Sequence, residues 1–191
     1  MNSNKTKKKR RIFIYYIIII LLISLISAFL YNLYPKVVYP IKYSEYVEAI
    51  SQEYELDQNL IYAIIKTESN FRPDAQSDVG ARGLMQLMEN AFDWVKYRMG
   101  DKSDISYDDM YSPECNIRYG SFMMKLLLEE YKDITTAVAA YHAGRGMVNK
   151  WLQNPEYSND GKTLDKIASR TTGHYVYKVM KSYEGYSKYY N

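Results

Sequence analysis

The chain has 191 residues, with 25 lysines and arginines, 22 aspartates and glutamates, and a single cysteine. Six of the basic residues lie in the first eleven positions, where there is no acid, so the rest of the chain carries a net charge of −3. A mildly acidic body lacks the positive field that phosphate binding needs, which argues against a nucleic-acid partner, and one cysteine excludes an intramolecular disulfide framework.

The N-terminal segment predicts a membrane anchor. Residues 12–31 contain no charged side chain, and a helix of twenty residues spans about 30 Å, the thickness of the hydrocarbon core. The alternative is a cleavable signal peptide, whose apolar region is usually about 7 to 15 residues long and ends in small residues. Because basic flanks stay in the cytoplasm, residues 1–11 should be a cytoplasmic tail. We therefore expect a signal anchor over 12–34 that crosses the cell membrane once, with the domain after it on the extracytoplasmic side.

A stem is expected over residues 35–43, with prolines at both ends of the segment 35–40, and one domain over 44–191. The apolar spacing in that domain is helical and no convincing alternating strand pattern appears, so we predict an all-α fold. Residues 70–83 form a long irregular stretch, which is typical of a functional loop. The predicted helices are 44–54, 58–69 with Asp57 as N-cap, 113–131, a segment from Asp133 to Gly144, and 172–190.

Glu68 is the first candidate for chemistry. It continues the apolar stripe of Leu60, Ile61 and Ile64 at helical spacing, so it should point toward the core from the last turn of its helix. Burial and the negative end of the helix both disfavour a carboxylate, and both should raise its pKa toward the range of a general acid. The alternative is a structural glutamate that pairs with a nearby arginine or reaches solvent.

Several separated motifs resemble, in order and spacing, the catalytic core of the soluble lytic transglycosylases, whose fold is similar to that of goose-type lysozyme. The likeness covers about residues 44–190. The matching segments are Glu68-Ser69-Asn70-Phe71-Arg72-Pro73, Ser77-Asp78-Val79-Gly80-Ala81-Arg82, Gly83-Leu84-Met85-Gln86, Asn116-Ile117-Arg118-Tyr119-Gly120, Ala139-Ala140-Tyr141-His142-Ala143-Gly144 and Tyr175-Val176.

The resemblance implies a set of site residues. Glu68 matches the catalytic acid and base, Tyr141 matches a tyrosine that faces the acid, and Gln86 matches a glutamine that lines the cleft. Hydroxyl and carboxamide groups can hold the N-acetyl and ring hydroxyl groups of a sugar through neutral hydrogen bonds. The residues expected to bind substrate are Ser77, Met85, Gln86, Tyr141, His142 and Tyr175.

Two positions depart from the pattern of the family. Where the family usually has Ala-Tyr-Asn-Ala-Gly, this chain has His142, which can still hydrogen-bond and can titrate near neutrality. Before the last helix the family often has Glu-Thr-Arg-x-Tyr-Val, whereas Thr171, Thr172 and Gly173 stand here, so the glutamate and arginine are missing. The chemistry of the acid should be unaffected, but the way in which the cleft holds its sugar or stem peptide should differ.

The resemblance implies a membrane-tethered lytic transglycosylase that cuts the β-1,4 bond between N-acetylmuramic acid and N-acetylglucosamine in peptidoglycan and leaves 1,6-anhydromuramic ends. Two alternatives remain: a muramidase in which Asp74 or Asp78 aids attack by water, and an inactive cell-wall-binding scaffold. We expect no cofactor and no metal, because the two histidines lie in no metal-binding motif. The expected partners are peptidoglycan strands, the membrane and proteins of an envelope machine. Trp94, Trp151 and Tyr177 are expected in the core.

Overall fold

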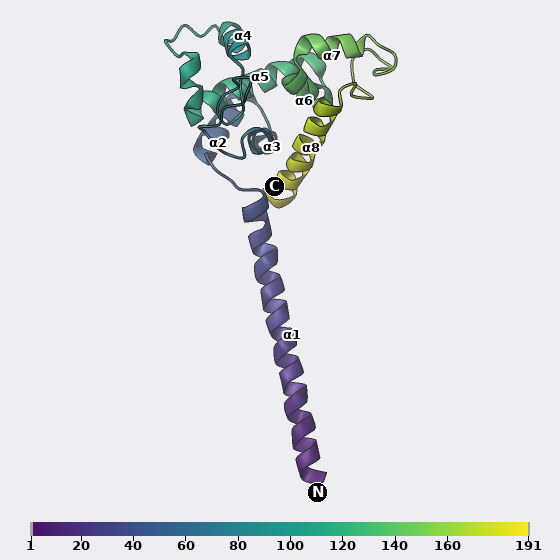
Figure 1. Ribbon diagram of the computed structural model, residues 1–191. Coiled ribbons are helices and arrows are strands. Elements are labelled where there is room, and N and C mark those ends of the chain that lie inside the picture. The colour runs from purple at the N-terminus through teal and green to yellow at the C-terminus, as the bar shows by residue number, and fades with distance from the viewer. Residues whose placement is uncertain (1, 191) are drawn as a thin grey trace. The chain divides into compact units, whose positions relative to one another are not determined.

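The computed structural model describes residues 2–190 (Figure 1). They divide into two compact units, with the boundary between Pro40 and Ile41.

The first unit is a single helix, α1, which runs from Asn2 to Val38. Its segment Phe13–Val38 has a mean hydropathy of 2.8, and none of it is buried in the protein. By length and composition this helix can cross a membrane. The stem expected from residue 35 begins inside this helix, which continues through Pro35 to Val38. A proline inside a helix removes one backbone donor, and the helix goes on beyond it, with the amide of Tyr39 donating to the carbonyl of Pro35 at 2.7 Å.

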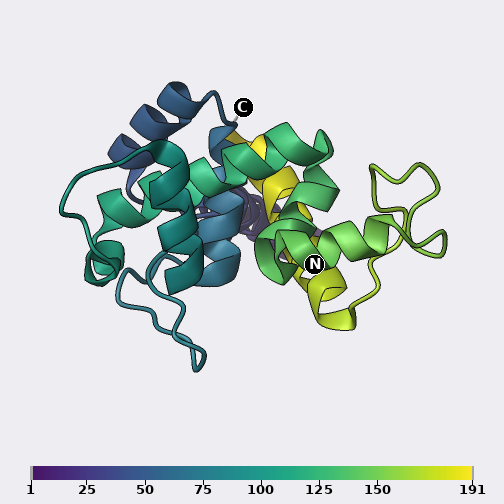
Figure 2. The same cartoon turned by 90° about the horizontal axis from the view of Figure 1, so that it is seen from above.

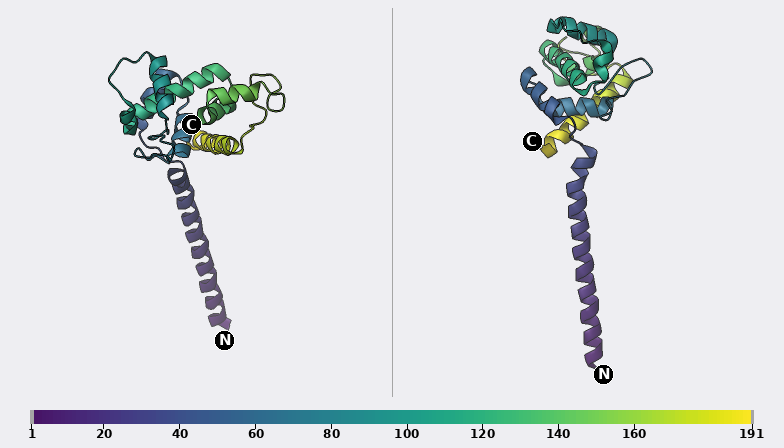
Figure 3. Two further views of the ribbon diagram at one scale, coloured as in Figure 1. Left: turned by 45° about the horizontal axis from the view of Figure 1, so that its top comes forward. Right: turned by 90° about the vertical axis from the view of Figure 1, so that its left-hand side faces the viewer.

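The second unit is built of helices, and no strand forms in residues 41–190. The all-α prediction is therefore confirmed. The elements are α2 (Ser44–Tyr54), α3 (Gln58–Glu68), α4 (Glu89–Met99), the 3₁₀ helix η1 (Tyr107–Tyr111), α5 (Pro113–Tyr131), α6 (Ile134–Ala143), α7 (Arg145–Leu152) and α8 (Arg170–Tyr190). A long connection between α7 and α8 leaves the helical body as a loop (Figure 3).

Capping residues explain why the predicted helices begin where they do. The side chain of Asp57 accepts a hydrogen bond from the amide of Asn59 at 2.8 Å, and that of Asp133 accepts one from Thr136 at 2.7 Å. Pro113 opens α5 at a position that needs no backbone donor. Gly144, with a φ of 82°, separates α6 from α7. Sequence patterns did not predict α4, η1 and α7.

Packing brings together two helices of the second unit that are far apart in the chain. Helix α3 packs along α8, and α6 contacts both α5 and α8 (Figures 1 and 2). The ring of Tyr186 in α8 stacks on that of Tyr62 in α3, with centroids 5.4 Å apart, and Tyr186 is fully buried. The consequence for the site is that the C-terminal end of α3 is covered by residues more than a hundred positions later in the chain.

Candidate active site

Glu68 is the last residue of α3 and lies half-buried. The three isoleucines that precede it on the same face, Ile61, Ile64 and Ile65, are fully buried, and they bring the end of the helix against the core. Burial raises the pKa of the Glu68 carboxyl to about 7, although a hydrogen bond from Tyr175 and the charge of Lys178 act in the opposite direction. The predicted shift toward a neutral-pH acid is confirmed.

Neither nearby arginine pairs with Glu68. Arg72 donates from Nε to the carbonyl of Ser69 at 3.2 Å, and Arg82 forms an ion pair with Asp108 at 2.6 Å. The partner of Glu68 is the hydroxyl of Tyr175, which donates to Oε1 at 2.7 Å. The reading of Glu68 as half of a structural ion pair therefore does not fit these contacts.

Two tyrosines flank the acid, and their hydroxyls have different partners. Tyr175 from α8 holds the Glu68 carboxyl, whereas Tyr141 from α6 donates to the carbonyl of Met85 at 2.9 Å. Burial, followed by the charge of Glu68, raises the pKa of both tyrosines well above the ordinary value, so both remain protonated donors. The hydroxyl that orients the acid thus belongs to Tyr175, and Tyr141 instead fixes the backbone of the neighbouring loop.

His142 lies at the end of α6, beside Tyr175. Its Nδ1 is 3.2 Å from Oγ1 of Thr172, and its ring centroid is 4.5 Å from that of Tyr175, with the planes 31° apart. Partial burial and the charge of Lys178 lower the pKa of His142. The imidazole is therefore mainly neutral at pH 7.

Asn116 fixes the segment that follows the irregular loop. Its buried side chain accepts from the amide of Met85 at 2.7 Å and donates to the carbonyls of Arg82 and Met110 at 2.9 and 2.8 Å. Gly83 is required here because a Cβ would collide with Met110 and Asn116, and its φ is +76°. No sequence pattern indicated this role of Asn116.

Met85 does not line a surface. Its side chain is 0% exposed and packs against Gly120, where a Cβ would come within 2.5 Å of the sulfur. The prediction that Met85 contacts substrate is therefore wrong for its side chain, because the helix α5 covers it. Met85 contributes to the site through its backbone, whose amide donates to Asn116 and whose carbonyl accepts from Tyr141.

Gln86 and Ser77 hold the irregular loop together. Gln86 has a φ of +49°, and its Nε2 donates to the carbonyls of Ala75 and Gly83 at 3.0 and 2.9 Å. The hydroxyl of Ser77 accepts from the amide of Ala81 at 2.9 Å. Both side chains are partly exposed. Besides this structural role, their contacts with a sugar stay a prediction.

Tyr141 and His142 line a cleft of about 420 Å³, together with Met88, which precedes α4, and Trp94 in the middle of that helix. Trp94 was expected in the core and instead borders this cleft. Trp151 is buried as expected, at 9% exposed, whereas Tyr177 is 60% exposed and that expectation is wrong.

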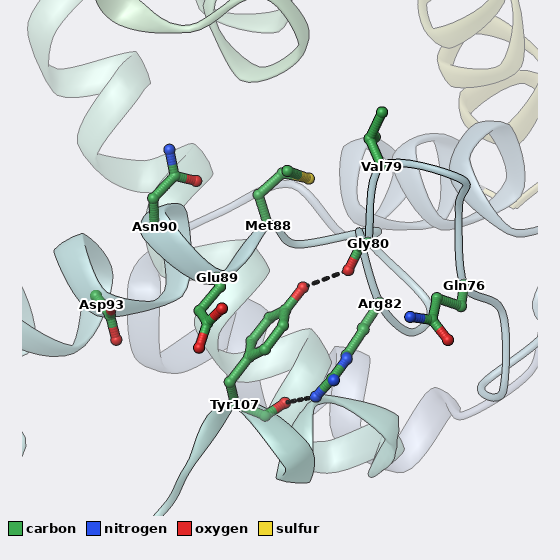
Figure 4. Close-up of a pocket in the computed structure, with 9 residues that line it drawn as sticks. All are labelled: Gln76, Val79, Gly80, Arg82, Met88, Glu89, Asn90, Asp93 and Tyr107. Atoms are coloured by element: carbon green, nitrogen blue, oxygen red, sulfur yellow. Dashed lines mark hydrogen bonds between the residues drawn. The ribbon is translucent and has the colours of Figure 1, made fainter.

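A second pocket, of about 510 Å³, adjoins this cleft through Met88 and Asn90, which line both. Figure 4 shows Arg82 and Tyr107 at its base, with Glu89 and Asp93 on α4. The hydroxyl of Tyr107 donates to the carbonyl of Gly80 at 2.6 Å, and the guanidinium of Arg82 lies 4.2 Å from the Tyr107 ring centroid. The two pockets together offer an extended polar and aromatic surface, and Tyr141, which lines the first of them, is near enough to Glu68 for the charge of that carboxyl to raise its pKa.

Within residues 2–190, no three histidine, cysteine, aspartate or glutamate side chains gather in a group that could hold a metal ion. The chemistry that the site can supply itself is proton transfer at Glu68, with neutral hydroxyl and amide donors around it.

A family model for the transglycosylase SLT domain matches residues 45–164. The chain belongs to this family. Among curated relatives, the transglycosylase of Enterobacteria phage PRD1 is 32% identical over 127 residues, which are 66% of this chain and 43% of that protein. The membrane-bound lytic murein transglycosylase C of Photorhabdus laumondii is 31% identical over 148 residues, 73% of this chain and 40% of that protein.

Solved structures of SLT-family proteins share the fold. An inactive glutamate-to-glutamine mutant of the lytic transglycosylase Slt from Pseudomonas aeruginosa superposes with a TM-score of 0.68 at 26% identity, over 81% of this chain and 25% of that one. The 70 kDa soluble lytic transglycosylase of Escherichia coli gives 0.70 at 25% identity, over 79% and 25%. This SLT-family chain spans less than half the length of the curated relatives that it matches.

Proposed function

We propose that the protein is a lytic transglycosylase that cleaves the β-1,4 bond between N-acetylmuramic acid and N-acetylglucosamine in peptidoglycan. The observation that carries this proposal is the environment of Glu68: a half-buried carboxyl with a pKa of about 7, held by the hydroxyl of Tyr175 and close to Tyr141, which lines the cleft. Membership of the SLT family supports the choice of substrate, since the relatives are named as lytic murein transglycosylases.

The reaction needs one group that first gives and then takes a proton. Protonated Glu68 donates its proton to the glycosidic oxygen, and the bond from that oxygen to C1 of the muramic acid breaks. The resulting carboxylate then accepts the proton of the C6 hydroxyl of the same sugar, whose oxygen bonds to C1. The product is a 1,6-anhydro ring, and no water is consumed. A hydroxyl within the substrate avoids the entropy cost of capturing a separate nucleophile.

The residues around Glu68 support a mechanism with a single carboxyl. A retaining glycosidase places its second carboxyl about 5 Å from the first, and an inverting one about 6.5 to 9.5 Å away. A carboxylate that near would raise the pKa of Glu68, yet the residues that perturb it within the described chain are Tyr175 and Lys178. Asp74 and Asp78, the carboxyls that the muramidase alternative would use, are exposed in the irregular loop.

We also propose that α1 anchors the protein in the cell membrane by a single pass. Its apolar length supports this arrangement, and the cluster of basic residues at its N-terminal end supports an amino terminus in the cytoplasm. The domain that follows would then lie outside, where peptidoglycan is found. Proteins of an envelope machine remain candidate partners of such an anchored enzyme.

Product analysis tests the proposed reaction. Full-length protein in detergent micelles is incubated with purified peptidoglycan, and the released saccharides are weighed by mass spectrometry. We expect 1,6-anhydromuramic ends, which are lighter by one water than hydrolysis products. Glu68→Gln should abolish their release, whereas Glu184→Gln, the same change at an exposed site on α8, should not.

Each alternative predicts a different outcome of that digestion. If only reducing muramic ends appear, and Asp74→Asn or Asp78→Asn is as damaging as Glu68→Gln, the protein is a muramidase. If the folded protein binds peptidoglycan but releases nothing, it is a wall-binding scaffold.

A further inference from the structure

The ring of His142 covers one face of Tyr175. The two centroids are 4.5 Å apart and the ring planes differ by 31°, so the imidazole lies over the phenol in a tilted stack. Tyr175 is buried, whereas His142 is exposed at the border of the cleft. The histidine therefore stands between the tyrosine and the cleft.

Thr172 holds the histidine ring in that orientation. Its Oγ1 lies 3.2 Å from Nδ1 of His142, and the threonine itself is only 2% exposed in the first turn of α8. Thr172 and Tyr175 are three positions apart on the same helix, so they lie on one face of it. One helix thus supplies both the surface that the imidazole packs on and the hydroxyl that fixes its rotation.

Tyr175 carries this arrangement to the acid, because its hydroxyl donates to Oε1 of Glu68 at 2.7 Å. We propose that His142 is a positioning residue, whose ring holds the Tyr175 side chain so that the phenol hydroxyl stays on the Glu68 carboxyl. The proposal rests on the proposed function and adds to it, since it assigns His142 an action through Tyr175 in place of a direct contact with substrate.

The direction of the effect follows from the groups that face the acid. Glu68 is approached by Tyr141 from α6, and by Tyr175 and Lys178 from α8; His142 is approached by Thr172, Tyr175 and Lys178. The hydrogen bond from Tyr175 lowers the pKa of Glu68, so its loss raises that pKa. A variant that frees Tyr175 should therefore keep its acid protonated to a higher pH while orienting it less well.

A double-mutant cycle tests the proposal with full-length protein in detergent micelles. The variants are His142→Ala, Tyr175→Phe and the double variant, and kcat, KM and the pH profile of peptidoglycan cleavage are measured for each. We expect His142→Ala to lower kcat by roughly tenfold with KM almost unchanged, and to move the alkaline limb upward by roughly half a pH unit. In the Tyr175→Phe background, which already lacks the hydroxyl, His142→Ala should have no further effect on that limb.

Two further variants distinguish the packing of the His142 ring from its hydrogen bond to Thr172 and from nonspecific effects of a substitution. His142→Phe keeps an aromatic face on Tyr175 and should retain most of the wild-type kcat. His174→Ala changes the other histidine, which is exposed on α8 next to Tyr175, and should match the wild type in kcat and pH profile.

The outcomes that overturn the proposal are distinct from a failure of the proposed function. Additive effects of His142→Ala and Tyr175→Phe, or a raised KM with unchanged kcat, would make His142 a substrate contact. If the wild-type protein cleaves nothing, the proposed function fails, yet the pKa of Glu68 can still be measured by carbon-13 NMR of its carboxyl. An unchanged Glu68 pKa in His142→Ala would then refute the positioning role by itself.

Discussion

The Oδ1 atom of Asn116 accepts a hydrogen bond from the backbone amide of Met85 at 2.7 Å, in a place where neither residue meets solvent. The same side chain donates to two carbonyls, so one amide of α5 satisfies three backbone groups of the segments around it. This arrangement fixes the stretch from Gly83 to Gln86 relative to α5, and Tyr141 adds a fourth bond at the carbonyl of Met85.

We expect Asn116→Ala to lower the free energy of unfolding by about 3 kcal/mol, because the amide of Met85 and the carbonyls of Arg82 and Met110 each lose a hydrogen-bond partner. Thermal and urea denaturation of the full-length protein in micelles measure this change. Asn159→Ala, at an exposed position in the loop before α8, is the matched control and should be neutral. Equal stability of the two variants would mean that the backbone around Met85 relaxes to new partners.

Activity should depend on the protonation of Glu68. The proposed mechanism begins with a proton on this carboxyl, whose pKa is raised to about 7 by burial. We therefore expect kcat to fall as the pH rises above about 7, tenfold for each pH unit beyond the limb. The pH profile of peptidoglycan release at saturating substrate measures it. A limb near pH 4.5, the ordinary range of a glutamate, would contradict the buried state.

The same pKa makes a prediction about stability. Folding raises the pKa of Glu68, so the folded state binds the proton more tightly, and stability is lost as the pH rises from about 4.5 to about 7. Above that window, ionisation of the buried carboxyl lowers the free energy of unfolding by up to about 3 kcal/mol. Glu68→Gln should therefore melt at a higher temperature than the wild type at pH 8 and at the same temperature near pH 4. Parallel melts at the two pH values check this expectation, and an equal shift at both would show that proton binding is not the cause.

Gln86→Ala should reduce both activity and stability. The carboxamide donates to two loop carbonyls, at Ala75 and Gly83, and both bonds are lost in alanine. The strain of a φ of +49° is the same for glutamine and alanine, because both carry a Cβ. We expect a loss of about 1 to 2 kcal/mol in the free energy of unfolding, together with a lower kcat. Gln86→Gly, which accepts the positive φ but also lacks the carboxamide, is the control for strain. A variant with full stability and low activity would indicate that the side chain serves substrate alone.

The anchor predicts a fixed topology. Protease added to wall-free cells should remove the domain that follows α1 and leave the N-terminal segment protected, because the basic tail keeps the amino terminus inside. Immunoblots with tags at either end of the protein distinguish the two fragments. Recovery of a soluble form without residues 1 to about 30 from the culture medium would identify the segment as a cleaved signal peptide.

Local signals were sufficient for most helix bounds. The start of a helix depends on contacts between residues a few positions apart. The starts predicted from Asp57, Asp133 and Pro113 therefore agree with the structure. Helix α4 was not predicted, because its N-cap, Met88, makes no side-chain capping bond. Its apolar face is also narrow, with Phe92 and Val95 as its buried residues. The 3₁₀ helix η1 is too short to carry a periodic pattern.

Long-range contacts limited what the sequence revealed about the site. The position and raised pKa of Glu68 follow from one helix and its apolar stripe, and both were predicted. The pairing of Glu68 with Tyr175 depends on how α8 packs along α3, which no local pattern encodes. The same holds for Met85. Its side chain is buried against Gly120, which has no Cβ and lies on a helix more than thirty residues later in the chain.

Helix α8 also determines when the proposed acid, Glu68, becomes buried. Tyr175 lies 107 residues beyond Glu68, and burial of the acid requires the last helix to be in place. A chain that has been synthesised and exported only as far as residue 169 lacks this cover, so its glutamate is hydrated and ionised at neutral pH. Under the proposed topology and reaction, the part of the domain next to α1 crosses the membrane first, so cleavage of the wall would wait until export of the whole domain is complete.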